Sequence, residues 1–263
     1  MREGMGIQQV SVQLVGGPTT IIEIGGLRFV TDPTFDSPRQ YEVGGRFLTK
    51  NMPPSLTAES IGAVDAVLLS HDQHVDNLDA KGREWMKGVQ TVFTTTEAAA
   101  RIPGVTSLPN WTSTQMARPD GRVITITGVP AQHGPDNTQH LVGEVTGFML
   151  SGDGLPTIYV SGDNASLSVV RAIAARFPSI DVAILFCGAA QTALLDYSNL
   201  TLGSEDAAQA AHILQASTVI PVHYEGWTHY TEGAESIRDA FERMQAQACL
   251  HLLMPGERVN LPG

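Results

Sequence analysis

Cysteine, positive charge and long hydrophobic runs are all scarce in this chain of 263 residues. The two cysteines, Cys187 and Cys249, are too few for a disulfide scaffold, so we expect two buried thiols in a reducing compartment. Lysine and arginine number 16 against 27 aspartates and glutamates, which gives a formal net charge of -11. A nucleic-acid surface needs a basic stripe and anionic lipid attracts basic segments. The sequence therefore predicts neither nucleic acid nor a membrane as a partner.

The chain also lacks the apolar segments of membrane and exported proteins. No apolar run approaches the roughly 18 residues of a membrane helix. Residues 1–17 place a Gly-Gly pair and polar side chains where an export signal needs an apolar core, so we expect a cytoplasmic protein. The hydrophobic content of 42% and the charged content of 16% are typical of an ordinary globular chain.

Strand-like and helix-like segments alternate along the chain in two similar rounds. Helices are predicted at residues 80–88, 96–102, 166–178, 204–216 and 234–247. We expect Asp79 and Ser204 to cap two of them. Residues 34–60 have no clear period and are predicted to form a loop over a sheet edge. No Pro-, Ser- or charge-rich linker interrupts the pattern, so we expect a single domain over residues 1–263, with helices outside two β-rich halves.

The densest group of reactive side chains follows the apolar segment 64–70. The sequence LLSHDQHVDNLD, residues 68–79, places five potential metal-binding or proton-handling side chains within seven residues: His71, Asp72, His74, Asp76 and Asn77. Charged groups are rarely buried at the end of a strand unless they are paired or bound to a metal. We therefore expect the chemistry of the protein in this loop.

Three more residues of the same kind follow predicted strands. They are His133 in PAQHGP, Asp163 in VSGDN and His223 in IPVHYEGW. Strand ends on one edge of a sheet converge, so these side chains can meet at one cleft. Imidazole and carboxylate groups without thiolate suit zinc, manganese or iron in an open, catalytic site.

The order of these residues resembles the metallo-β-lactamase superfamily, whose pattern is His-x-His-x-Asp-His, then a lone His, a lone Asp and a final His. The resemblance covers nearly the whole chain. It is closest to the branch of ascorbate-phosphate-lactonase-like and phospholipase-D-type hydrolases, which share the Asp32-Pro33 turn and a motif ending in Leu78-Asp79. The resemblance implies an α/β fold, a four-layer αββα sandwich with two mixed sheets face to face and helices outside. It also implies a hydrolytic site for one or two metal ions.

The first motif departs from the superfamily pattern at two positions. An alignment on His74 and Asp76 puts Asp72 in place of the first histidine and Asn77 in place of the last. An alignment on the preceding Leu-Leu-Ser-His makes His71 the first ligand instead. Neighbouring side chains on extended backbone point in opposite directions, so only one of the two faces the metal, and we favour Asp72.

The resemblance implies two overlapping ligand sets. The first set consists of Asp72, His74, His133 and Asp163. The second set consists of Asp76, a bridging Asp163 and His223. Asn77 would be a weak neutral ligand, so we expect either one Zn²⁺ ion or two, with manganese or iron as alternatives.

The function implied is hydrolysis of an ester, lactone, amide or phosphodiester bond of a small molecule by metal-activated hydroxide. Asp76 is predicted to orient the nucleophile as ligand or general base, and His223 to stabilise the oxyanion. Trp227 is a candidate wall of the substrate pocket, whereas His229 is assigned to ordinary packing or to the rim of the cleft. A non-catalytic binding protein on the same fold and an iron site with redox chemistry are the alternatives. A homo-oligomer is expected from the branch alone.

Overall fold

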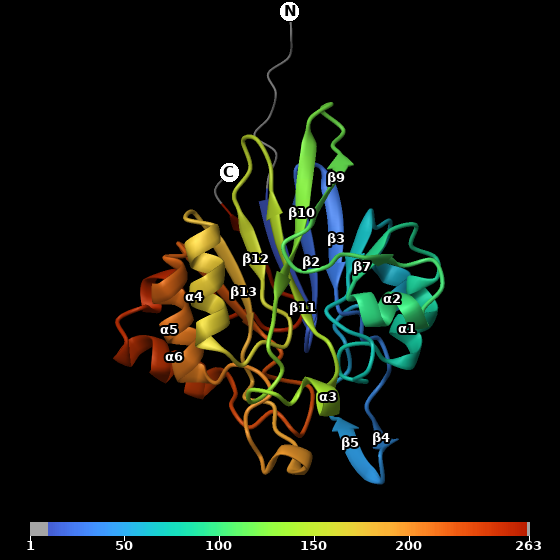
Figure 1. The fold of residues 1–263 in the computed structure, drawn as a ribbon, viewed down its shortest axis with the longest axis vertical. Coiled ribbons are helices and arrows are strands. Elements are labelled where there is room, and N and C mark those ends of the chain that lie inside the picture. Colours follow the sequence, from blue (N-terminus) through green and yellow to red (C-terminus); the bar gives the residue numbers. More distant parts are fainter. Residues whose placement is uncertain (1–9, 262–263) are drawn as a thin grey trace, which may run out of the picture.

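The computed structural model describes residues 10–261 of the protein. Residues 1–9, which carry part of the expectation that no export signal is present, lie outside the described residues. Two large sheets pack face to face, and helices cover the outer face of each (Figure 1). The predicted αββα sandwich with mixed sheets is confirmed.

The first sheet has seven strands and both antiparallel and parallel pairs. In spatial order they are β15 (Arg258–Leu261), β1 (Val10–Gly16), β2 (Thr19–Ile24), β3 (Leu27–Thr31), β6 (Ala66–Leu68), β7 (Val92–Thr94) and β8 (Thr106–Ser107). Pairing is antiparallel from β15 to β3 and parallel from β3 to β8. The last strand of the chain thus closes the edge beside the first.

The second sheet has six strands and is also mixed. In spatial order they are β14 (Thr218–Val222), β13 (Val182–Phe186), β12 (Ile158–Val160), β11 (Thr146–Ser151), β10 (Val123–Pro130) and β9 (Ser113–Ala117). The pairs from β14 to β12 are parallel and those from β12 to β9 are antiparallel. The parallel strands β12 and β14 therefore end on the same side of the sheet.

The two sheets bury one apolar layer between them. In β1 the inward residues are Val10, Val12 and Leu14, at the alternate spacing of a strand. They belong to the same cluster as Ile124 and Phe148 of the second sheet, and all five side chains are fully buried. This shared layer holds the two halves of the chain in a fixed relation.

Helices lie on the outer faces of both sheets (Figure 1). Those with the strongest apolar faces, α4 (Leu167–Arg176), α5 (Ser204–Leu214) and α6 (Ala234–Arg243), cover the second sheet. The first sheet is covered by α1 (Ala80–Met86) and α2 (Thr96–Arg101). Shorter helical turns are η1 (Ala58–Ser60), α3 (Gln139–Val142), η2 (Ala193–Leu195) and η3 (Gln247–Cys249). Within residues 10–261, none of these helices has the length and apolarity needed to span a bilayer.

The predicted helix caps are half right. The Asp79 carboxylate accepts a hydrogen bond from the Gly82 amide, as expected of an N-cap. The prediction for Ser204 is wrong by one residue, because Gly203 occupies the cap position of α5 and the Glu232 carboxylate accepts from the Ser204 amide. A carboxylate from a distant loop has replaced the local serine cap.

The predicted loop over residues 34–60 contains a hairpin, β4 (Arg39–Val43) and β5 (Arg46–Lys50). The hairpin stands away from both large sheets at one end of the molecule (Figure 1). Its strands have few buried residues, so the sequence carries no alternation of apolar and polar positions. At its base the buried Lys50 ammonium lies 3.1 Å from the Asp79 carboxylate.

Gly188, just after β13, is expected to be intolerant of any side chain. A Cβ atom there would lie 2.2 Å from the carbonyl oxygen of His223. We predict that Gly188→Ala lowers the free energy of unfolding by about 1–3 kcal/mol, the usual cost of overpacking. Urea denaturation measures the change. Gly88→Ala is the matched control, because its nearest contact would be an ordinary 3.4 Å; equal stability losses in both variants would contradict the prediction.

Candidate metal centre

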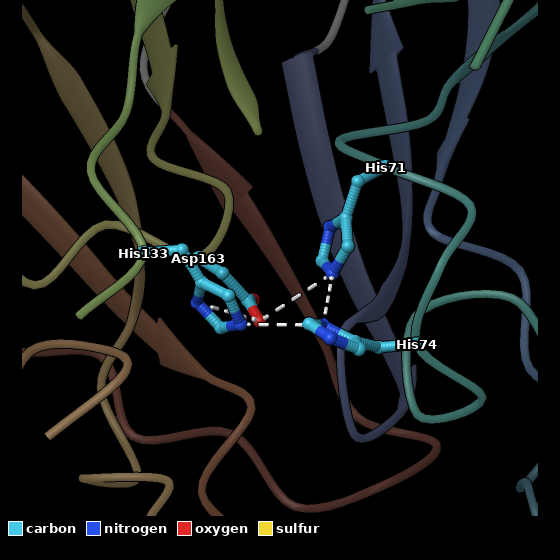
Figure 2. Close-up of side chains that lie close together, drawn as sticks. All are labelled: His71, His74, His133 and Asp163. Carbon is cyan, nitrogen blue, oxygen red and sulfur yellow. Dashed lines mark hydrogen bonds and ion pairs between the residues drawn. The ribbon is translucent and has the colours of Figure 1, made fainter. Parts of the chain in front are cut away.

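The predicted site residues come together from the ends of strands in both sheets. His71 and His74 lie in the loop after β6 of the first sheet. From the second sheet, His133 follows β10 and Asp163 follows β12. Figure 2 shows the two pairs of side chains entering from opposite sides and pointing toward one another. The site therefore lies across the junction of the two sheets.

Four side chains form a compact group with one ligand atom each within 4.8 Å of all the others: His71, His74, His133 and Asp163. Nε2 of His71 lies 2.9 Å from Nδ1 of His74, and Nε2 of His133 lies 3.2 Å from that same nitrogen. The Asp163 carboxylate is 3.9 Å from Nε2 of His71. Four zinc ligands at about 2.0–2.2 Å from the ion lie about 3.3–3.6 Å apart. The observed spacings lie within about 0.4 Å of that range, so small shifts of the side chains would complete a tetrahedral set.

Hydrogen bonds behind the group fix the orientation of two imidazole rings. Nδ1 of His133 lies 2.8 Å from the Leu200 carbonyl oxygen, which only accepts, so Nδ1 carries the proton. Nδ1 of His71 lies 2.9 Å from the Ser70 hydroxyl, which in turn lies 2.6 Å from the Asp32 carboxylate. With Asp32 ionised, Ser70 donates to it and accepts from His71. Nε2 of His71 and Nε2 of His133 are then both unprotonated and face Nδ1 of His74, so both lone pairs are available to a cation.

The protonation states of the buried imidazoles also suit a metal. Burial, reinforced by the neighbouring imidazoles, holds the pKa of His71 well below its usual value. Burial likewise lowers the pKa of His133 to about 4, although Asp163 opposes the shift. Both rings are therefore neutral at neutral pH. A metal ligand must be unprotonated, so the group is ready to bind without losing protons from these two rings.

Asp32 holds the ligand loop in place through hydrogen bonds to Ser70 and Asn77. Its carboxylate accepts hydrogen bonds from the backbone and hydroxyl of Ser70 and from the Asn77 amide. Burial raises the pKa of Asp32 to about 7 against the effect of these hydrogen bonds, and a positive ion nearby would lower it. The Asp32-Pro33 turn thus supports the loop that carries His71 and His74.

The structure corrects the expectation that Asp72 rather than His71 faces the site. The Asp72 carboxylate turns away and lies 3.1 Å from Nε of Arg101, with Arg83 at 3.8 Å. His71 and Asp72 point in opposite directions, as adjacent residues do, and Asp72 has arginines from α1 and α2 as partners. Because Arg101 is 29 positions away in the sequence, the motif itself gave no sign of this pair.

Asp76, the predicted catalytic carboxylate, lies beside a second group of side chains. Nε2 of His223 is 3.4 Å from Oδ2 of Asp76 and 3.5 Å from Oδ1 of Asp163. The side chain of His229, assigned to packing or to the cleft rim from the sequence, lies 2.9 Å from Oδ2 of Asp76. The predicted residues of the second set are therefore close together, with one histidine more than expected.

The charges of this second group reinforce one another. Burial alone would raise the pKa of Asp76, but His229 and His223 hold it well below its usual value. Burial alone would lower the pKa of His223, but Asp163 and Asp76 raise it above the usual value. His223 has a left-handed backbone, with φ of 58°, and neither ring nitrogen has a hydrogen-bond partner among residues 10–261. Buried imidazole nitrogens without a hydrogen bond and strained backbone are typical of functional positions.

Trp227, the predicted substrate contact, is 3% exposed. Its ring packs 5.4 Å from the ring of Tyr41 in the hairpin, and the Lys50 ammonium lies 5.7 Å from its centre. This placement links the hairpin to the body of the protein, and the contact between Trp227 and substrate stays a prediction.

Comparison with known proteins places the chain in a family. The model of the β-lactamase superfamily domain matches residues 27–224. The chain therefore belongs to the β-lactamase superfamily. A metal-dependent hydrolase of Pyrococcus abyssi is 28% identical over 96% of this chain and 100% of its own length. One from Pelotomaculum thermopropionicum is 29% identical with the same coverage.

The fold is similar to that of an isothiocyanate hydrolase from Delia radicum gut bacteria. The TM-score is 0.81 and the identity 21%, over 95% of this chain and 98% of that chain. The predicted superfamily is confirmed, and the prediction of a metal-dependent hydrolase agrees with the names of the relatives. The lactonase-like branch stays a prediction.

Metal content separates the two possible first ligands. We predict that His71→Ala weakens binding of the first ion at least tenfold, because it removes one of four converging ligands. Asp72→Ala, which breaks only the pair with Arg101, should keep the metal content of the wild type. Plasma mass spectrometry on gel-filtered protein gives ions per chain. Loss of metal in Asp72→Ala and retention in His71→Ala would contradict the prediction and would make Asp72 the first ligand, as the alignment on His74 and Asp76 implied.

Proposed function

We propose that the protein is a metal-dependent hydrolase that acts on a small molecule and holds zinc at His71, His74, His133 and Asp163. The observation that carries this proposal is the convergence of four ligand side chains, three of them buried and His74 half-buried, with the Nε2 atoms of His71 and His133 facing the same nitrogen of His74. Three nitrogens and one carboxylate oxygen suit zinc in a catalytic site, and membership of the β-lactamase superfamily supports the same reading.

A zinc ion held there would polarise the scissile group and lower the pKa of a water molecule. The residues of the chain then have separate tasks. Asp76 is ionised, because His229 and His223 hold its pKa well below the usual value, so it can orient the attacking water and accept its proton. His223, whose pKa is raised beside Asp163 and Asp76, can donate to the oxygen that gains charge.

A cavity beside His133 supports a small and uncharged or cationic substrate. Its volume is about 500 Å³, within the range of small-molecule sites. Asp136 and Glu144 line it together with amide side chains such as Asn110 and Gln132. No lysine or arginine lines it among the residues that the structure describes. Among ester, lactone, amide and phosphodiester bonds, the neutral esters, lactones and amides therefore suit the cavity best. A cytoplasmic location and a homo-oligomer stay predictions.

Hydrolysis by the metal-loaded protein tests the proposal. We expect turnover in a panel of esters, lactones, amides, phosphodiesters and isothiocyanates, and loss of that turnover after chelation with recovery on adding zinc. Asp76→Asn should lower kcat/KM by about 10²–10⁴, the usual contribution of a general base. Asp239→Asn is the matched control, because Asp239 is exposed on α6, on the outer face of the second sheet.

The same assay distinguishes the alternative of a non-catalytic binding protein. Tight binding of a panel compound without turnover, with Asp76→Asn binding it equally well, would replace the hydrolase by a binder. Equal turnover before and after chelation would contradict the metal-dependent proposal directly.

The charge of the cavity gives a separate prediction about specificity. The double variant Asp136→Asn with Glu144→Gln should raise kcat/KM for anionic substrates, relative to neutral ones, by about fivefold. This corresponds to about 1 kcal/mol of relieved repulsion. Paired assays on a neutral ester and its carboxylate-bearing analogue measure the ratio. Glu235→Gln with Asp239→Asn removes the same charge from α6 and should leave the ratio unchanged; an equal rise there would assign the effect to net charge alone.

A further inference from the structure

Asn77 stands where the superfamily pattern has its last motif histidine. Its side-chain nitrogen makes two hydrogen bonds, whereas Oδ1 has no hydrogen-bond partner among residues 10–261. The amide nitrogen lies 3.0 Å from Oδ2 of Asp32 and 3.0 Å from Oδ1 of Asp163. Both partners are carboxylates, so the nitrogen donates to both and the orientation of the amide is fixed. Its oxygen is a neutral ligand of a kind that suits zinc less well than imidazole does. The motif therefore leaves the second group one nitrogen short.

His229 brings a nitrogen to the same group from another part of the chain. Its Nε2 lies 2.9 Å from Oδ2 of Asp76, and Nε2 of His223 lies 3.4 Å from that oxygen. Nε2 of His223 also lies 3.5 Å from Oδ1 of Asp163. The contacts of 3.4 and 3.5 Å fall within the roughly 3.3–3.6 Å between neighbouring ligands of a tetrahedral zinc ion, and the 2.9 Å contact of His229 is shorter. Two imidazoles and two carboxylates are thus linked by successive contacts, from His229 through Asp76 and His223 to Asp163.

The loop from His223 to His229 turns back on itself and brings His229 beside Asp76. It turns at His223 and at Gly226, whose φ values of 58° and 87° are both left-handed. The Thr228 amide donates to the Thr49 carbonyl oxygen of β5 at 3.0 Å, which fastens the loop to the hairpin. The side chain of His229 is 13% exposed, so the nitrogen is held inside while the site remains reachable.

We infer that His229 is a ligand of a second metal ion, together with Asp76, Asp163 and His223, and that it takes the place left open by Asn77. The inference deepens the proposed function and rests on it, and it changes one role given there. With the second ion bound, Nε2 of His223 is a ligand and must be unprotonated, so it no longer donates a proton to the oxygen that gains charge. The second site would accordingly not be weakened by Asn77, contrary to the expectation from the motif. The chain would hold two ions, with Asp163 shared between the two sets.

One rival role for His229 uses the same contact. A protonated Nε2 would donate a hydrogen bond to Asp76 and only position that carboxylate, as the Tyr230 hydroxyl does at 3.3 Å. Nδ1 of His229 has no hydrogen-bond partner among residues 10–261, so no described contact fixes which nitrogen carries the proton. Glutamine separates the roles, because its amide can still donate to Asp76 but is a poor zinc ligand.

Titration of the metal-free protein with Zn²⁺ tests the inference without reference to activity. Calorimetry, with metal per chain from plasma mass spectrometry, is applied to wild type, His229→Ala and His229→Gln. The wild type should bind about two ions, and both variants should keep the first and weaken the second at least tenfold. His140→Ala is the control, because His140 is exposed on α3 and should leave both ions bound. Retention of the first ion shows that each variant is folded.

Three outcomes would overturn the inference. They are a second ion bound by His229→Ala as tightly as by wild type, full recovery of the second ion in His229→Gln, and a wild type that binds only one ion. A wild type that binds no zinc at all would overturn the proposed function as well. Loss of the second ion alone is distinct from the absence of zinc in the wild type, because neither His229 nor His140 belongs to the first group of ligands.

Discussion

The packing of the two sheets against each other is the constraint on which the rest of this molecule depends. The grouped side chains do not come from one element or even from one sheet: His71 and His74 belong to the first, His133 and Asp163 to the second. Their mutual distances therefore depend on the apolar layer between the sheets, to which none of the four belongs. A tightly packed interior resists small displacements, so the layer keeps the ligand atoms close together.

Buried hydrogen bonds fix the orientation of the ligand side chains that the packing of the sheets brings together. Asp32 acts through Ser70 on His71 and through Asn77 on Asp163, so one carboxylate braces a ligand from each sheet. On the opposite side, the Leu200 carbonyl oxygen orients His133. Partners of this kind usually determine which ring nitrogen faces a metal. The asparagine that looks like a lost ligand in the motif is, in the fold, part of this brace.

The helices and many of the strands were readable from the sequence because alternation, buried strands and helix caps are local signals, as at Asp79. The four-layer arrangement of the two sheets was implied by the resemblance to the metallo-β-lactamase superfamily. The hairpin within residues 34–60 was missed because its exposed strands show no period. In the site, strand-end position predicted that His133 and Asp163 would meet. The choice between His71 and Asp72 was not local, since it depends on Arg101, a residue distant in sequence. The role of each residue in binding and catalysis still rests on the proposals.

The position of the site across the sheet junction has a consequence for the lifetime of the protein in a cell. An ion bound there would connect two halves of the chain that otherwise contact each other mainly through their apolar layer. A ligand that binds only the native state stabilises that state by mass action. Chains made when that metal ion is scarce would then open more often and be cleared by proteases sooner. The abundance of the protein would then follow the metal supply without any dedicated regulator.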